Sequence, residues 1–250
     1  MRILTLLIIF AIPVYADHPL SEAERKVMIE NYEKLIESST QLITVDATNV
    51  QAYSQRGDLN FFLGRFDEAV ADYKKMVELE PQLDASHWRL GIAYFYANEF
   101  EQAAAQFGRY HAFDNVDREN GIWRYLSQYK ATGPKQAAAE LLKYDKDDRE
   151  PFGDVYKLFS KEVTGKEILN KIKAAEISDQ EREKRLFYAN LYIGLNDLVE
   201  GNQQSAQQQL RAAVASHWPR KAGFGPNYMW HVARVQYDLL ARANDEKDLE

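Results

Sequence analysis

The sequence predicts an all-α fold in which helical hairpins stack side by side into a solenoid. Two observations predict it: residue types recur at a spacing of 34, and 46% of the residues are hydrophobic while only 7 of 250 are proline. The recurring pairs are Gly57 and Gly91, Phe66 and Phe100, Ala69 and Ala103, and Tyr73 and Phe107. One period is long enough for two helices and a turn, so each period is expected to form one hairpin.

The residue types at these offsets have physical reasons. Glycine is unfavourable within a helix, so Gly57 and Gly91 indicate that a neighbouring helix approaches closely there. Small Ala69 leaves room for that approach on the second helix, and Pro81 ends that helix. We therefore expect one repeat at 50–83 and a second at 84–117.

A period of 34 with glycine, aromatic and alanine residues at these offsets resembles the tetratricopeptide (TPR) repeat. The resemblance implies a right-handed superhelix with a terminal capping helix at each end. It also implies that the first helix of each hairpin lines the concave side.

The N-terminus carries the features of a secretory signal peptide. Arg2 precedes a nearly continuous apolar run, and Val14-Tyr15-Ala16 fits a cleavage site. We expect cleavage near Ala16 and a periplasmic or secreted protein. The alternative is a retained anchor, but the run is shorter than the roughly 20 residues that span a bilayer, so no stable membrane anchor is expected.

The segments that flank the two clear repeats are more divergent. Segment 17–49 has helical periodicity, with Ser21 placed as an N-cap, and is expected to be a capping or degenerate repeat. Segment 118–150 is expected to be a degenerate TPR in which Tyr125 replaces the first-helix glycine and residues 131–134 form the turn.

The pattern is interrupted and then returns. Residues 151–186 are expected to form a helical insert, and 187–220 a TPR-like repeat that contains Gly194 and Gly201. Residues 221–250 are expected to be a capping helix, with one apolar face between Met229 and Leu240, followed by a tail.

This order of units is similar to NlpI-type TPR proteins of the bacterial envelope. The similarity includes the Trp123–Leu126 unit, the insert, the repeat that begins with Phe187-Tyr188 and the closing helix, and it spans about 50–240. It implies an adaptor that gathers proteases and peptidoglycan hydrolases. Such proteins are anchored through a lipidated cysteine, and this sequence has no cysteine, so tethering is not expected.

Composition argues against several classes of function. The net charge of −7 disfavours a nucleic-acid partner, and the lack of cysteine removes a thiol nucleophile. The five histidines show no metal-ligand spacing. We therefore expect no catalytic, metal or cofactor residues. A helical enzyme site around Asp58, His87 and Glu119 is the least favoured alternative.

The concave groove is the expected binding surface. By the TPR pattern it carries one cation and five aromatic residues: Phe62, Trp88, Arg89, Tyr96, Trp123 and Tyr129. Aromatic anchors are typical of protein-binding sites. The alternative is that these side chains are buried between helices, and for Trp123 packing is the favoured interpretation. A clamp for a peptide carboxylate is disfavoured because Ser54, Asp58 and Glu119 occupy its positions.

Together these observations predict an exported, non-enzymatic scaffold whose groove binds a peptide or a helix of a partner protein. The alternative is a self-assembling module, with a homodimer as its simplest form.

Overall fold

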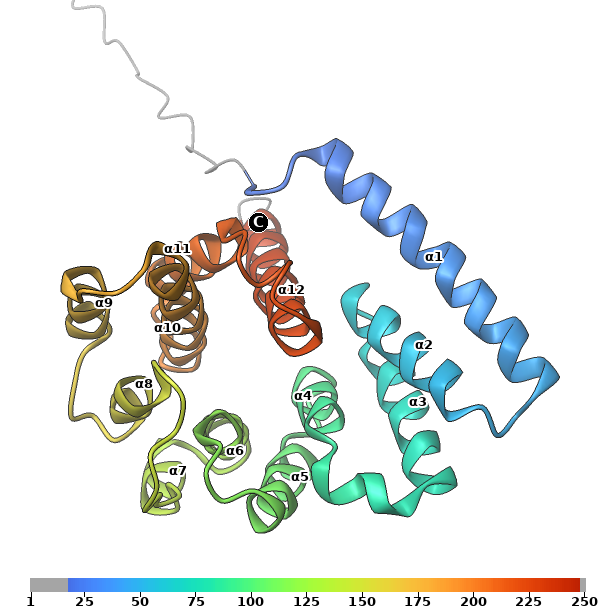
Figure 1. Cartoon of the computed structure of the whole chain (residues 1–250), viewed down its shortest axis with the longest axis horizontal. Helices are drawn as coiled ribbons and strands as arrows, with labels where there is room; N and C mark the ends of the chain where they lie inside the picture. Colours follow the sequence, from blue (N-terminus) through green and yellow to red (C-terminus); the bar gives the residue numbers. More distant parts are fainter. Residues whose placement is uncertain (1–17, 248–250) are drawn as a thin grey trace, which may run out of the picture.

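The computed structural model describes residues 18–247, and the predicted signal peptide at 1–16 lies outside them. The described part is an all-α solenoid of the TPR type, and no strand occurs between residues 18 and 247. Figure 1 shows the helices following one another around a ring, with the last helix between α11 and α2. The helices are α1 (Glu22–Val45), α2 (Val50–Phe62), α3 (Phe66–Leu79), η1 (Pro81–Ser86), α4 (Trp88–Tyr96), α5 (Phe100–Phe113), α6 (Arg118–Thr132), α7 (Pro134–Ala139), α8 (Phe152–Phe159), α9 (Gly165–Ala174), α10 (Asp179–Val199), α11 (Gln203–Ala215) and α12 (Phe224–Lys247).

Three hairpins share the same turn and the same packing. Helices α2 and α3, α4 and α5, and α10 and α11 each connect through a residue with positive φ: Gly64 at 78°, Asn98 at 62° and Gly201 at 84°. Such angles favour glycine or asparagine. The turn residues Gly64 and Asn98 lie 34 positions apart, so the turn repeats together with the helices.

The helices of these hairpins approach closely where the sequence places glycine. A Cβ atom at Gly57 would lie 2.7 Å from Cε1 of Tyr73, and one at Gly91 would lie 2.6 Å from Cζ of Phe107. At Gly194 the nearest atom is Cγ of Leu210, at 2.9 Å. The close helix contact predicted from the repeat glycines is therefore confirmed.

The degenerate repeat at 118–150 makes its close approach at a glycine that lies outside the repeat register. Tyr125 does replace the glycine at its offset, but the close approach moves to Gly121, where a Cβ would lie 2.4 Å from the hydroxyl oxygen of Tyr144. The predicted turn is present, because α6 ends at Thr132 and Gly133 has φ 92°. Helix α7 has only 6 residues, so an irregular segment replaces most of the second helix.

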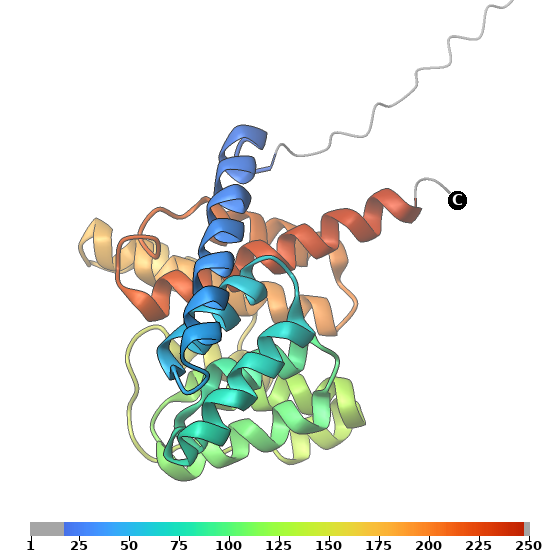
Figure 2. The same ribbon diagram turned by 90° about the vertical axis from the view of Figure 1, so that its right-hand side faces the viewer.

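Segment 18–49 contains one long helix rather than a hairpin. Ser21 and Glu24 form a capping box at the start of α1. The helix packs along α2, where Ser39 donates a hydrogen bond to Gln55 at 3.2 Å. Figure 2 shows α1 on the outside of the array.

The insert continues the solenoid instead of interrupting it. Helices α8 and α9 form close to the predicted positions, and α8 packs against both α6 and α10. Phe152, Val155 and Phe159 are buried in that interface, while α9 contributes buried Ile168 and Ile172.

Helix α12 does more than cap the end of the array. It packs on the preceding helix α11 as predicted, but every residue from 228 to 237 is buried, so the helix is covered on all sides there. The cause is a contact with the first repeat: His231 stacks on Phe62 with ring centroids 3.8 Å apart, and the hydroxyl oxygens of Tyr228 and Tyr73 are 3.2 Å apart. Helix α12 therefore lies between α11 and the first repeat and closes the array (Figure 1).

Candidate functional site

A cavity remains on the concave side between α4, α6, α10 and the start of α12. Its volume is about 370 Å³, within the usual range of ligand sites, roughly 300–1,000 Å³. Its lining is Trp88, Ile92, Tyr110, Asp117, Glu119, Asn120, Trp123, Arg149, Lys184, Tyr188, Trp218, Gly225, Pro226 and Met229. We call this space the concave cavity.

Three tryptophans form much of the apolar wall of the concave cavity. Trp88 opens α4 and packs edge-on against Tyr228, with ring centroids 4.9 Å apart. Trp218 lies in the loop after α11, where its backbone N–H donates to Glu183 at 2.8 Å. Trp88 and Trp218 are half-buried, whereas Trp123 is only 1% exposed. Two of the three indoles are therefore accessible to a ligand.

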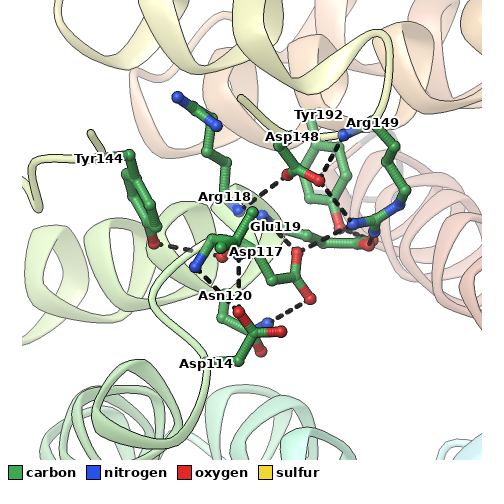
Figure 3. A network of polar contacts seen from close by, with 10 residues as sticks. Asp114, Asp117, Arg118, Glu119, Asn120, Tyr144, Asp148, Arg149 and Tyr192 are labelled. Atoms are coloured by element: carbon green, nitrogen blue, oxygen red, sulfur yellow. Dashed lines mark hydrogen bonds and ion pairs between the residues drawn. The ribbon is translucent and has the colours of Figure 1, made fainter. Parts of the chain in front are cut away.

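A polar network lines another part of the concave cavity. Asp117 caps α6 through the backbone N–H of Glu119. Arg149, in the loop between α7 and α8, donates to Asp117 at 3.1 Å and to Asp148 at 3.2 Å, and it is also paired with Glu119. Figure 3 shows these three carboxylates around the one guanidinium. We call these four residues the Arg149 network.

Ionisation of every carboxylate in the Arg149 network is unfavourable, because the carboxylates are largely buried and outnumber the guanidinium by three to one. Burial raises the pKa of Glu119 to about 7, the neighbouring Asp117 adds to the rise, and Arg149 opposes it. The pKa of Asp117 is also raised, mainly by burial. Tyr192 donates a hydrogen bond to Glu119, and burial followed by that carboxylate raises the pKa of the Tyr192 hydroxyl well above its usual value. Glu119 therefore changes its charge near neutral pH.

Three of the six predicted groove residues are covered by the fold. Phe62 is 8% exposed beneath His231, and Tyr96 is 7% exposed against Phe61. Trp123 is buried as the packing alternative expected, although it contributes to the cavity lining. The expectation of an open groove is wrong for Phe62, which α12 covers, and for Tyr96, which is buried against aromatic side chains of the repeats.

The other predicted groove residues differ in position. Arg89 is committed to an ion pair with Asp58 at 2.6 Å and a hydrogen bond to Ser54 at 3.0 Å. Tyr129 is half-buried against Tyr125, and neither Arg89 nor Tyr129 lines the concave cavity. Of the predicted set, the structure brings only Trp88 and Trp123 together at the cavity.

Sequence reasoning missed the polar wall and Trp218. The mixed charges of 145–150 indicate a solvated loop, and five of these six residues are exposed, but the Asp148 side chain is only 5% exposed and Arg149 reaches the cavity. Arg149 was the one residue in this run that could have indicated the network, because three aspartates precede it within the run. Trp218 follows the last hairpin and lies outside the repeat pattern, so the pattern did not predict it as a cavity residue.

The residues of the least favoured enzyme alternative do not form one site. His87 accepts the backbone N–H of Leu90 at 3.2 Å, and Asp58 is held by Tyr73 and Arg89. Glu119 belongs to the separate Arg149 network. Among residues 18–247, no group of His, Asp and Glu is arranged to hold a metal ion.

Residues 57–98 match the sequence model of the TPR repeat family. This match supports a TPR protein. It covers the end of α2, all of α3 and α4 and the turn after α4, which are parts of the two repeats with the clearest 34-residue register. TPR proteins are generally non-enzymatic scaffolds for protein–protein interaction. In the part of the chain that the structure describes, no helix is long and apolar enough to cross a membrane.

Proposed function

We propose that this TPR protein is an exported scaffold that binds a segment of a partner polypeptide in the concave cavity. The observation that carries the proposal is the cavity itself: two accessible tryptophans face it on the side of a solenoid where TPR proteins bind their partners. Accessible aromatic anchors beside polar groups suit a protein-binding site. The cavity volume of about 370 Å³ limits the bound segment to a few residues.

The proposal also includes export of the protein and the class of its partners. The apolar run with its cleavage motif at 14–16 supports export, and no lipidated cysteine is present for tethering. The similarity to NlpI-type proteins supports envelope proteases or peptidoglycan hydrolases as partners. We expect the protein to act in the periplasm or after secretion.

The proposal is tested by capture of partners with a cavity variant and a matched surface variant. Trp88→Ala combined with Trp218→Ala removes both accessible anchors of the cavity. Phe113→Ala removes an aromatic side chain that is 65% exposed on α5, outside the cavity. We expect the double variant to lose partners that the wild type and the Phe113 variant both retain. Equal retention by all three proteins would refute the cavity as the binding site.

Self-association is the second candidate function, and a feature of α1 favours it. Five of the seven large hydrophobic side chains that are exposed in the described part of the chain lie on α1, namely Val27, Ile29, Leu35, Leu42 and Val45, at 42–88% exposure. Leu35 and Leu42 lie one turn on either side of Ser39, so they border the face that packs on α2. Such a concentration on one helix is more typical of a contact surface than single scattered residues are.

Sedimentation at several concentrations tests self-association. If α1 mediates it, the mass rises with concentration, and Leu35→Lys combined with Leu42→Lys keeps the protein monomeric. A wild type that stays monomeric at every concentration would eliminate this candidate without affecting the cavity proposal.

A further inference from the structure

We infer that the concave cavity binds a protonated amine of the partner polypeptide, most simply a lysine side chain, between the tryptophan rings and the carboxylates of Asp117 and Glu119. This inference rests on the proposed function and gives the bound segment its chemistry.

The charges of the Arg149 network call for a cation. Asp117, Glu119 and Asp148 surround the Arg149 guanidinium, which leaves these four residues with a net charge of −1 when Glu119 is protonated and −2 when it is ionised. The side chains of these carboxylates are only 5–19% exposed, so water screens them weakly. A second positive charge at the cavity would offset this excess and favour the ionised form of Glu119.

The same charges disfavour an anionic ligand. Arg149 is already shared among three carboxylates, and Lys184, the other cation of the lining, donates to Glu181 at 3.2 Å. An anion would have to displace one of these partners and would face Asp117 and Glu119. A peptide carboxylate is therefore the wrong ligand for this site.

The apolar wall suits the rest of such a ligand. An ammonium group over the face of an indole is attracted by the ring, and the methylene chain of lysine packs on apolar surface. Trp88 and Trp218 offer accessible rings for both contacts. In addition, Trp123 of the cavity lining has a buried indole N–H with no acceptor in hydrogen-bond geometry, which leaves this wall of the cavity incompletely satisfied.

The inference is tested by titrating the protein with three capped pentapeptides that differ at one residue. Each has the form acetyl-Gly-Gly-X-Gly-Gly-amide, where X is lysine, the neutral isostere norleucine, or glutamate. Binding is followed by the indole N–H signals in nitrogen–proton spectra. Trp230 is the internal control, because it is not part of the cavity lining and its indole N–H donates to the carbonyl oxygen of Val214 at 2.9 Å.

The lysine peptide should shift the Trp88 and Trp218 signals saturably, leave Trp230 unchanged and bind about tenfold more tightly than norleucine. Glu119→Gln keeps the size of the side chain and removes its charge, so it should abolish this preference while binding of norleucine stays the same. Asp117→Asn is the second variant, and the dispersion of the spectra shows whether each variant is folded.

Equal binding of the lysine and norleucine peptides, or tighter binding of glutamate, would overturn the inference and leave peptide binding in the cavity intact. No binding of any peptide would also overturn it. Failure of the proposed function is a different result, namely retention of partners by the Trp88→Ala, Trp218→Ala variant.

Discussion

Single glycines set how closely the helices of each repeat approach, and the sequence alone identified two of them. Gly57 and Gly91 could be predicted because they recur at the repeat period and because glycine is unfavourable within a helix. Gly121 could not be predicted in the same way: its contact, Tyr144, comes from an irregular segment that has no period. Repetition therefore locates a packing residue only where both partners repeat.

Gly91→Ala tests this packing. The new Cβ would lie 2.6 Å from the ring of Phe107, which is fully buried and cannot move aside, so we expect a loss of about 1–3 kcal/mol in the free energy of unfolding. Gly153→Ala in α8 is the control, because its surroundings within 4 Å are empty; it should be neutral or stabilising by up to about 1 kcal/mol. Urea denaturation measures both, and similar effects at the two sites would contradict the packing account.

Glu119 gives a prediction for the dependence of stability on pH. Its pKa is about 7 in the folded protein against an ordinary value of 4.5, so between these values the folded state holds a proton that the unfolded state has released. Stability should therefore fall as pH rises from 4.5 to 7, by up to about 3 kcal/mol from this group. Above pH 7 this contribution should stay constant.

The measurement is the difference in unfolding free energy between wild type and Glu119→Gln, because groups that do not interact with Glu119 titrate equally in both. His87, for example, has a pKa lowered to about 3 by burial and acts in the opposite direction, favouring stability as pH rises toward 6.5. The wild type should lose stability relative to the variant as pH rises. A difference that does not change with pH would mean that Glu119 is not buried among carboxylates.

At the scale of elements, helix positions were predictable and long-range partners were not. Local periodicity and caps such as Ser21 predicted α1, and the apolar face of 229–240 predicted α12. The same periodicity missed the second buried side of α12, because Tyr228 and His231 have partners more than 150 residues away. The polar contacts of Asp148 and Arg149 were missed for a related reason, since their partners lie at the start of α6.

Closure by α12 is tested with two aromatic residues of that helix. Tyr228→Ala removes a fully buried ring that contacts both Phe61 and Trp88, so we expect a loss of about 3–5 kcal/mol. Phe224→Ala, at the exposed start of the same helix, should cost less than about 1 kcal/mol. Thermal and urea unfolding compare the two. A small effect at Tyr228 would show that α12 does not close the array in solution.

For the whole molecule, closure decides which part of the predicted groove can bind a partner. The TPR pattern correctly placed Trp88 and Trp123 on the concave side, where both line the cavity. It could not show that α12 closes the array and covers Phe62, or that Arg149 and Trp218 reach the cavity. The fold could be predicted because it repeats, whereas the site depends on the unique parts that close it.

The most direct test of the account is photo-crosslinking in the native cell from within the cavity. A photoreactive phenylalanine analogue replaces Trp88 in one variant and exposed Phe113 in another. If a partner segment occupies the concave cavity, position 88 forms a defined adduct with another polypeptide and position 113 does not. Adducts from position 113 alone, or none from position 88, would contradict the account.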